Sequence, residues 1–219
     1  MKKLVIFGTD AFARLCHHHF THGSDYTVAG FTVDGAYVKE PTFCGLPVVP
    51  FEDVESRFPP DSCHMFVAAG IREINAFRAR KVDEAEGKQY TLATYVSARA
   101  AIPPDLTLRP NTMIMEFALV QPFVELGRNV IIWPRTAIGL YTRIRDHCWA
   151  VCSLFGESGD VGERSIIGVG ATIAPFIKIG KRNIIGAGAL IMKDTKDDEV
   201  YRAVATRPSS VPSSRLKLD

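Results

Sequence analysis

A six-residue spacing of aliphatic side chains runs through the second half of the chain. From residue 102 such a residue recurs at every sixth position: Ile102, Leu108, Ile114, Val120, Leu126, Ile132, Ile138 and Ile144, then Ala150. This period matches neither the 3.6 residues of a helical turn nor the alternation of an ordinary strand. It is typical of a hexapeptide β-helix, in which each six-residue unit forms one flat side of a triangular coil. The pattern therefore predicts a β-helix.

The spacing slips by one residue near the middle of this repeat. It resumes in a new frame at Phe155, Val161, Ile167, Ile173, Ile179, Ile185 and Ile191. Comparable places on successive coils are 18, 17 and 18 residues apart, which predicts about five coils with one of them a residue short. A missing residue would normally turn the later side chains away from the core. Because the later pattern is intact, a corner must absorb the loss, and residues 156–160 are the expected place.

The first half alternates strand signals with helix signals. Apolar runs predict strands over residues 3–8, 26–33, 63–69 and 90–96. Helical patterns cover residues 10–20 and 71–86. Such alternation implies a small parallel sheet. We therefore expect a Rossmann-like α/β domain at 1–98, a left-handed parallel β-helix at 99–195 and a C-terminal tail at 196–219.

The turn after the first strand resembles a nucleotide-binding turn. Residues 8–13 keep only the first glycine, Gly8, of the Gly-x-Gly-x-x-Gly pattern. The turn favours a ligand phosphate near the N-terminus of the following helix. Asp34, at the end of the second strand, is a candidate ribose or base contact; the alternative is a solvated loop acid.

Composition narrows the classes of function. A formal net charge of +2 does not suggest a nucleic-acid surface, and no apolar run has the length of a membrane span. Five scattered cysteines favour reduced thiols in the cytoplasm. Cys148 and Cys152 have no second pair to complete a zinc site. Consecutive helical residues point about 100° apart, so the histidines at 17–19 do not converge on one ion. We expect no metal site.

Taken together, the two parts resemble the NeuD/PglD-like sugar acyltransferases of bacterial glycan biosynthesis. The likeness is carried by residues 4–10, 31–34, 43–50, 68–78 and 185–194. It covers nearly the whole chain. By this resemblance the protein is a cytoplasmic homotrimer that transfers an acyl group, with acetyl-CoA as co-substrate, to a nucleotide-linked amino sugar.

The resemblance also implies site residues. Acyl-CoA would lie in the groove between adjacent β-helices, at positions that include Gly170, Ala171, Gly188 and Ala189. The nucleotide would contact Gly8, Thr9, Asp10, Asp34, Gly70, Asn75 and Arg78. For Asn75 and Arg78 the alternative is an ordinary exposed helix face.

The sequence departs from the family where the chemistry would occur. The family's general-base histidine falls on Leu140, and the acid that follows it falls on Tyr141. A second family histidine falls on Trp149. The short coil comes directly after these positions.

Three interpretations remain open. The protein can be an acyltransferase without the usual base, since general base catalysis is worth about 10²–10⁴-fold and positioning contributes separately. Another group can replace the histidine, and the candidates are His147, Asp146, Tyr141 and Glu116. Alternatively, the protein is a catalytically silent relative that binds a nucleotide sugar or a partner protein. For His147 a surface or interface role is the competing interpretation, and for Glu116 it is a solvated corner acid.

Overall fold

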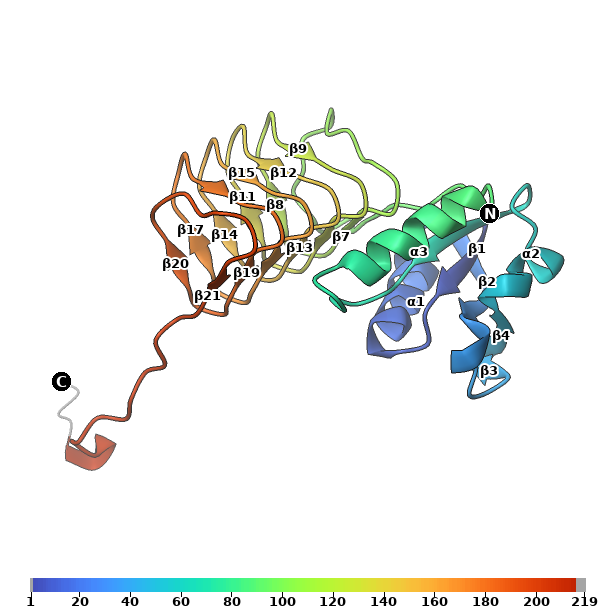
Figure 1. The fold of residues 1–219 in the computed structure, drawn as a ribbon, viewed down its shortest axis with the longest axis horizontal. Helices are drawn as coiled ribbons and strands as arrows, with labels where there is room; N and C mark the ends of the chain where they lie inside the picture. Colours follow the sequence, from blue (N-terminus) through green and yellow to red (C-terminus); the bar gives the residue numbers. More distant parts are fainter. Residues whose placement is uncertain (1, 216–219) are drawn as a thin grey trace.

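The computed structural model describes residues 2–215, which form an α/β domain followed by a β-helix (Figure 1). The α/β domain is built on a five-stranded sheet of order β3-β4-β2-β1-β5. Its strands are β1 (Lys2–Phe7), β2 (Tyr26–Val33), β3 (Thr42–Phe43), β4 (Leu46–Pro50) and β5 (Cys63–Val67). Neighbouring strands are parallel, except that β3 is antiparallel to β4.

Helices cover both faces of this sheet. Alternate residues of a strand point to opposite faces, so Leu4 and Ile6 pack beneath α1 (Ala11–Gly23), whereas Val5 and Phe7 belong to the cluster that includes α3 (Ala76–Gly87). The remaining short elements are η1 (Gly35–Tyr37), η2 (Phe51–Asp53) and α2 (Val54–Arg57). The expected parallel α/β sheet is confirmed.

The helix predicted from residue 71 begins five residues later. Glu73, Ile74 and Asn75 have φ angles of 55°, 50° and 62°, so they form a left-handed turn that cannot belong to an α-helix. The last expected strand is also shorter, since β6 covers only Tyr95–Val96. The helical pattern of side chains in the sequence does not reveal that residues 73–75 adopt left-handed backbone angles, so it placed the start of the helix too early.

The second half is a left-handed parallel β-helix, as the hexapeptide spacing predicts (Figure 1). Its two-residue strands stack into three sheets. Sheet I contains β7 (Met113–Ile114), β10 (Ile131–Ile132), β13 (Trp149–Ala150), β16 (Ile166–Ile167) and β19 (Ile184–Ile185), flanked by β6 and β21 (Val200–Tyr201). Sheet II contains β8 (Leu119–Val120), β11 (Ala137–Ile138), β14 (Leu154–Phe155), β17 (Thr172–Ile173) and β20 (Leu190–Ile191). Sheet III contains β9 (Glu125–Leu126), β12 (Arg143–Ile144), β15 (Asp160–Val161) and β18 (Lys178–Ile179).

The inward residues of these strands form one continuous core. Every predicted frame position from Ile114 to Ile191 is buried in it, whereas Ile102 and Leu108 are only partly buried before the first full coil. Because β21 pairs with β19, regular structure continues past residue 195. The chain then extends away from the β-helix through η3 (Ser213–Arg215), and residues 216–219 of the expected tail lie outside the described residues (Figure 1).

Each corner of the β-helix contains one residue in the left-handed region. These residues have φ between 44° and 70°, and only two of them are glycine. They are Phe117, Phe123, Asn129, Arg135, Tyr141, His147, Cys152, Ser158, Arg164, Gly170, Phe176, Arg182 and Gly188. The backbone of a residue that carries a Cβ is strained at such φ angles, and the hydrogen bonds between stacked coils maintain this conformation.

The missing residue of the short coil lies in a different corner from the expected one. Ordinary corners have four residues between strands, but only residues 151–153 join β13 to β14. The register changes there, because Leu154 pairs with Ala137 and with Thr172, at separations of 17 and 18 residues. Residues 156–159 form an ordinary four-residue corner. The prediction of 156–160 was therefore wrong, since glycine and polar content marks flexible corners but not short ones.

The three flat sides of the β-helix differ in their outward residues. On sheet I, Met113, Ile131 and Trp149 are buried against the α/β domain. On sheet II the outward positions are Leu119, Ala137, Leu154, Thr172 and Leu190. On sheet III they are Glu125, Arg143, Asp160 and Lys178. The sides are thus a covered apolar side, an uncovered and mostly apolar side, and a charged side.

A buried arginine fastens the α/β domain to sheet I. Arg78 of α3 is fully buried. Its Nε donates to Asn129 Oδ1 at 2.9 Å, and its Nη2 donates to the His147 carbonyl at 2.9 Å. Its guanidinium carbon lies 5.0 Å from the ring centre of Trp149. Burial lowers the pKa of Arg78 to about 9, so the side chain stays charged at neutral pH.

Two asparagines extend this contact. Asn75 Nδ2 donates to the Arg164 carbonyl at 3.0 Å, and its Oδ1 accepts from Arg78 Nη1 at 3.2 Å. Asn111 accepts from the Val67 amide at 2.7 Å and donates to Asn129 Oδ1 at 2.9 Å. The carboxyl end of β5 is therefore tied to the first coils, and the two parts of the chain form one hydrogen-bonded unit.

We expect Arg78→Ala to lower the free energy of unfolding by about 3 kcal/mol or more, because it leaves several buried acceptors unpaired. Urea unfolding measures this loss. Arg80→Ala is the matched control on the same helix: Arg80 pairs with Glu73 at the surface, where an ion pair contributes little. Equal losses in the two variants would contradict a fastening role for Arg78.

Candidate functional site

A pocket of about 530 Å³ opens at the carboxyl ends of β1, β2 and β5. In open parallel sheets, ligands bind at this end of the strands. The structure brings five of the predicted nucleotide contacts together here: Gly8, Thr9, Asp10, Asp34 and Gly70. Other lining residues include Tyr37, Lys39, Ile71, Arg72 and Phe77. We call this cavity the sheet-end pocket.

Gly8 is required by the shape of this pocket. Its φ is 127°, which side-chain-bearing residues rarely adopt, and an added Cβ would lie 2.6 Å from the Ala68 carbonyl oxygen. The backbones after β1 and β5 therefore approach each other closely.

Both acids in the pocket already have partners. Asp10 caps α1, and its Oδ1 accepts from the Ala13 amide at 2.9 Å. Asp34 Oδ1 accepts from Lys81 Nζ at 2.6 Å, and Lys81 also pairs with Glu84 at 2.7 Å. Lys39 and Arg72 are the remaining charged side chains of the lining. They supply the positive charge that an anionic ligand would meet.

Asn75 and Arg78 do not belong to this pocket. Both are fully buried in the contact with the β-helix, where their polar groups are hydrogen-bonded. For Asn75 and Arg78 the sequence predicted either a nucleotide contact or an exposed helix face, and the buried contact with the β-helix agrees with neither. The left-handed turn before α3 is the physical reason, because it directs this part of the helix toward sheet I.

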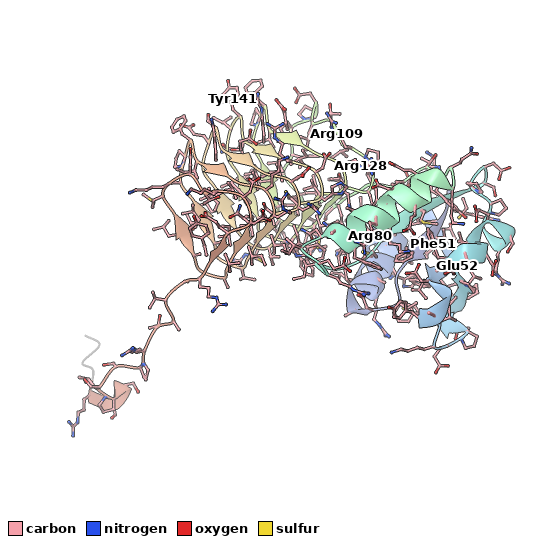
Figure 2. The ribbon with its side chains drawn as sticks, in the orientation of Figure 1. Phe51, Glu52, Arg80, Arg109, Arg128 and Tyr141 are labelled. Carbon is pink, nitrogen blue, oxygen red and sulfur yellow. The ribbon has the colours of Figure 1, made fainter. Side chains whose placement is uncertain are left out.

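Leu140 and Tyr141 lie at the edge between sheets II and III. Tyr141 is exposed and stacks on Phe123 of the previous coil, with ring centres 4.8 Å apart and planes 11° apart. The Leu140 amide donates to Gln121 Oε1 at 2.9 Å. In Figure 2 Tyr141 is at the outer rim of the β-helix. Aromatic and aliphatic groups thus occupy the place where the resemblance expects an acid and a base.

His147 and Asp146 lie at another edge, between sheets III and I. His147 Nδ1 is 2.8 Å from Asn129 Nδ2, so Nδ1 accepts and the proton belongs on Nε2. Burial and the nearby Arg128 lower the pKa of His147. Asp146 Oδ1 accepts from the Arg128 amide at 3.0 Å. Arg128 also reaches α3 through Asp83 and Glu86. The structure therefore separates His147 from Tyr141.

Glu116 lies at the edge between sheets I and II, beside a histidine that the sequence did not assign to a site. His19 of α1 is largely buried, and its Nε2 is 3.8 Å from Glu116 Oε2. Burial lowers the pKa of His19, and the Glu116 charge opposes that effect. In the sequence, the two residues are 97 positions apart and belong to different domains, so no spacing pattern predicts the pair.

The four glycine and alanine positions predicted for acyl-CoA lie farther along the same edge. Gly170 and Gly188 are left-handed corner residues with φ of 69° and 70°. An added Cβ at either would find no heavy atom closer than 3.8 Å. Ala171 and Ala189 point into the core, so only their backbones could meet a ligand. The left-handed corner position of this edge is therefore without a side chain on the last two coils, and the Val169 side chain beside it is exposed.

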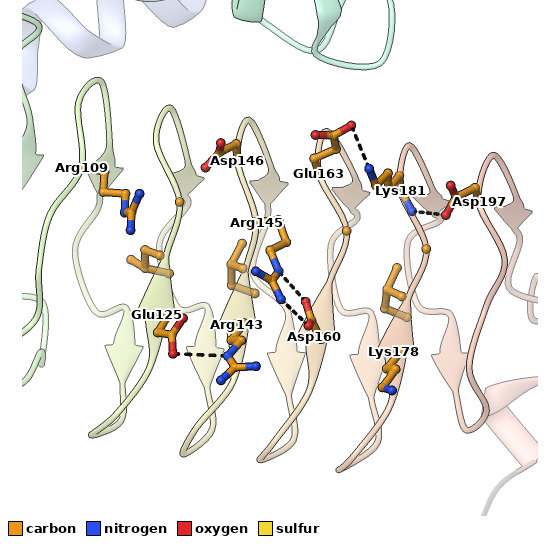
Figure 3. A pocket seen from close by; sticks show the side chains of 16 residues that line it. Arg109, Glu125, Arg143, Arg145, Asp146, Asp160, Glu163, Lys178, Lys181 and Asp197 are labelled. Atoms are coloured by element: carbon orange, nitrogen blue, oxygen red, sulfur yellow. Dashed lines mark hydrogen bonds and ion pairs between the residues drawn. The ribbon is translucent and has the colours of Figure 1, made fainter.

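A second cavity, of about 620 Å³, follows sheet III (Figure 3). Its charges alternate in sign from coil to coil. Arg143 pairs with Glu125 at 3.2 Å, and Arg145 makes a two-point contact with Asp160 at 2.6 and 2.8 Å. Arg143, Arg145 and Lys181 have acidic partners, whereas Arg109 and Lys178 form no ion pair with the residues that the structure describes. Because acids and bases alternate along the groove, it offers no concentration of one charge to a ligand.

Two further findings concern metals and membranes. Within residues 2–215, no group of three or more His, Cys, Asp or Glu side chains is placed to hold a metal ion. No helix in that part of the chain has the length and apolar character needed to cross a membrane.

Comparison with known proteins gives structural matches only. The sequence matches no protein-family model and no curated protein. A histidine-to-asparagine variant of perosamine N-acetyltransferase from Caulobacter crescentus, solved with CoA and GDP-perosamine, aligns over 91% of this chain and 93% of its own, with a TM-score of 0.81 and 24% identity. The acetyltransferase domain of PglB from Neisseria gonorrhoeae covers 91% and 96%, with a TM-score of 0.67 and 19% identity. WeeI from Acinetobacter baumannii covers 91% and 96%, with a TM-score of 0.58 and 20% identity. The two-part fold is thus shared over nearly the whole chain.

We expect Gly8→Ala to lower the free energy of unfolding by about 1–3 kcal/mol and to distort the sheet-end pocket, because it strains the backbone and crowds Ala68. Gly87→Ala is the control, since no heavy atom lies within 4 Å of its added Cβ. Thermal unfolding of both variants measures the difference. A Gly8→Ala protein as stable as Gly87→Ala would contradict the close approach.

Proposed function

We propose that the protein is an acyl-CoA-dependent N-acyltransferase that transfers an acetyl group to a nucleotide-linked amino sugar in bacterial glycan biosynthesis. The observation that carries the proposal is the pairing of a sheet-end pocket with a docked left-handed β-helix. A solved structure with the same two-part fold holds CoA and GDP-perosamine. On this assignment, Gly8, Thr9, Asp10, Asp34 and Gly70 hold the nucleotide, and Lys39 and Arg72 face its phosphates.

Acyl-CoA is assigned to the edge between sheets I and II. Gly170 and Gly188 have no side chains at this edge, so an extended ligand can lie against their backbone. No metal takes part in the proposed reaction. We also propose a cytoplasmic location, which is consistent with five free cysteines within the described residues.

The proposed reaction needs little from the protein beyond orientation and proton transfer. Holding the amine against the thioester carbonyl replaces a bimolecular encounter, and backbone N–H groups stabilise the oxygen charge that develops. The neutral amine attacks the carbonyl carbon, the C–S bond breaks, and the amine proton finally reaches the thiolate. The products are an amide and free CoA.

A silent binding protein is the second candidate. In its favour is the resemblance, by which Leu140 and Trp149 stand where the family has histidines. Trp149 is buried and contacts Phe12 and Trp133 with ring centres 4.9 and 5.6 Å apart. Such a packed aromatic cluster fills space that a ligand would otherwise use.

Incubation with acetyl-CoA should add the mass of one acetyl group to at least one nucleotide-linked amino sugar, GDP-perosamine being the first to try. Mass spectrometry of a panel of such sugars checks this, with heat-treated protein as the control. Binding of acetyl-CoA without any acetylated product would favour the silent relative. If the assay gave no acetylated product and acetyl-CoA did not bind, the acyltransferase assignment would be wrong.

We further propose that sheet II forms the homotrimer contact. Leu119, Leu154 and Leu190 are 44%, 50% and 62% exposed and lie in line on alternate coils. Sheet I is already covered, and the charges of sheet III favour solvent. A closed threefold arrangement buries one such side on every subunit, and uncovered apolar surface of this kind marks association sites.

Leu154→Glu should therefore convert the trimer into monomers, because it places a charge in a desolvated contact. Light scattering after size-exclusion chromatography gives the mass. Lys178→Glu changes an outward residue of sheet III in the same way and should leave the mass unchanged. A Leu154→Glu protein with the wild-type mass would contradict the assigned face.

A further inference from the structure

The structure contains one histidine–carboxylate contact at the junction of the two domains. His19 belongs to α1 of the α/β domain, and Glu116 belongs to the first full corner of the β-helix; Nε2 and Oε2 are 3.8 Å apart. The Tyr95 ring lies beside His19, with ring centres 5.1 Å apart. Among the described residues, no other histidine lies within ion-pair distance of an acid.

Two buried polar atoms at this corner have no protein partner. Glu116 Oε2 and Trp133 Nε1 are both enclosed without a hydrogen bond to any of residues 2–215. Trp133 directly follows β10, the strand that stacks on β7, so the two residues lie on adjacent coils. A buried acceptor or donor without a partner is costly unless a ligand or an ordered water satisfies it. A ligand bound at this corner would supply a donor to Glu116 Oε2 or an acceptor to Trp133 Nε1.

The same edge leads to the glycine and alanine positions assigned to acyl-CoA. The corner residues of this edge, coil by coil, are Phe117, Arg135, Cys152, Gly170 and Gly188. Stacked strands are about 4.8 Å apart, so the four steps from Phe117 to Gly188 span about 19 Å. A long thioester lying on this edge can therefore place its nucleotide end at the glycines and its acyl end near Glu116.

From these observations we infer that His19 is the general base of the proposed acyl transfer and that Glu116 is its positioning residue. The inference rests on the proposed function and supplies a base for it from outside the β-helix. With Nε2–H directed at Glu116, Nδ1 carries the lone pair that accepts the proton. The contact is longer than a hydrogen bond, and catalytic contacts often shorten when the substrate binds.

The proton balance is complete with these groups. The amine nitrogen attacks the thioester carbonyl carbon, and the new C–N bond forms as the carbonyl oxygen takes the negative charge. His19 removes the proton from the attacking nitrogen. The C–S bond then breaks, and the proton passes from His19 to the departing thiolate. The imidazolium present between these steps is stabilised by the Glu116 carboxylate.

The surroundings keep His19 neutral and ready to accept a proton. Burial lowers its pKa, and the neighbouring Arg99 lowers it further. Glu116 acts in the opposite direction and raises the pKa. Tyr95 and His18 are the other titratable groups beside the ring. Replacing the Glu116 charge should therefore lower the pKa of His19.

The test uses the full-length protein, acetyl-CoA and an acceptor that wild type acetylates in the mass-spectrometry panel. We expect His19→Gln to lower kcat by about 100- to 10,000-fold, with little change in KM for acetyl-CoA. His22→Gln is the matched control, because His22 is exposed on the same helix and should retain wild-type kcat. Thermal unfolding of each variant shows that the fold is kept.

Glu116→Gln tests the positioning role with a readout that a merely structural residue would not move. His19 works when neutral, so activity falls as pH drops through its pKa. Loss of the Glu116 charge lowers that pKa, so the acid limb of the kcat/KM profile should move to lower pH while the maximum falls. An acid limb at the same pH in wild type and in Glu116→Gln would overturn the role of Glu116.

The outcomes separate this inference from the proposed function. Turnover by wild type together with similar turnover by His19→Gln overturns the inference and leaves the acyltransferase assignment in place. No turnover by wild type with any acceptor removes the assignment, and the catalytic role of His19 falls with it.

Discussion

The arrangement of the whole molecule depends on one buried guanidinium. Arg78 is fully buried without a carboxylate partner, and a charge in such a place persists only where dipoles replace its hydration. Asn129, backbone carbonyls and the face of Trp149 supply those dipoles from the β-helix. Because the acceptors have fixed positions, they set the orientation of the α/β domain. Phe12 of α1 packs against Trp149, the ring that Arg78 also contacts, so α1 lies against sheet I at the same place.

The β-helix separates stability from function within each two-residue strand. The inward residue is aliphatic in nearly every strand and contributes only packing to the core. The outward residue is free to differ, and it alone makes sheet I a docking side, sheet II an uncovered apolar side and sheet III a charged side. Corner residues add a second variable position. The pair Phe123 and Tyr141 and the bare Gly170 and Gly188 are equivalent places that differ only in side chain.

The sequence was sufficient for what depends on local spacing. It predicted the frame positions, the parallel α/β sheet and the grouping of Gly8, Asp10 and Asp34 at one end of that sheet. It failed where distant segments decide the outcome. The left-handed turn at residues 73–75 is maintained by its contact with the β-helix. The short corner at 151–153 is maintained by pairing with the neighbouring coils. Arg78 has the sequence context of an exposed helix, and its burial follows only from docking. His19 meets Glu116 for the same reason, which is why neither pattern nor resemblance pointed to the histidine.

The two ends of α1 give the proposed assignment its internal consistency. Asp10 caps the helix in the sheet-end pocket, and His19 lies nine residues later, about 13 Å along the axis at 1.5 Å per residue. An acceptor held in the pocket by its nucleotide must carry its reacting amine across that distance. A nucleotide-linked sugar has its amine remote from the base and the phosphates, whereas a free amino sugar would leave the pocket unused. A rigid helix that joins a binding pocket to a proton acceptor therefore selects a long acceptor, and the binding energy of the nucleotide can orient the amine at the far end.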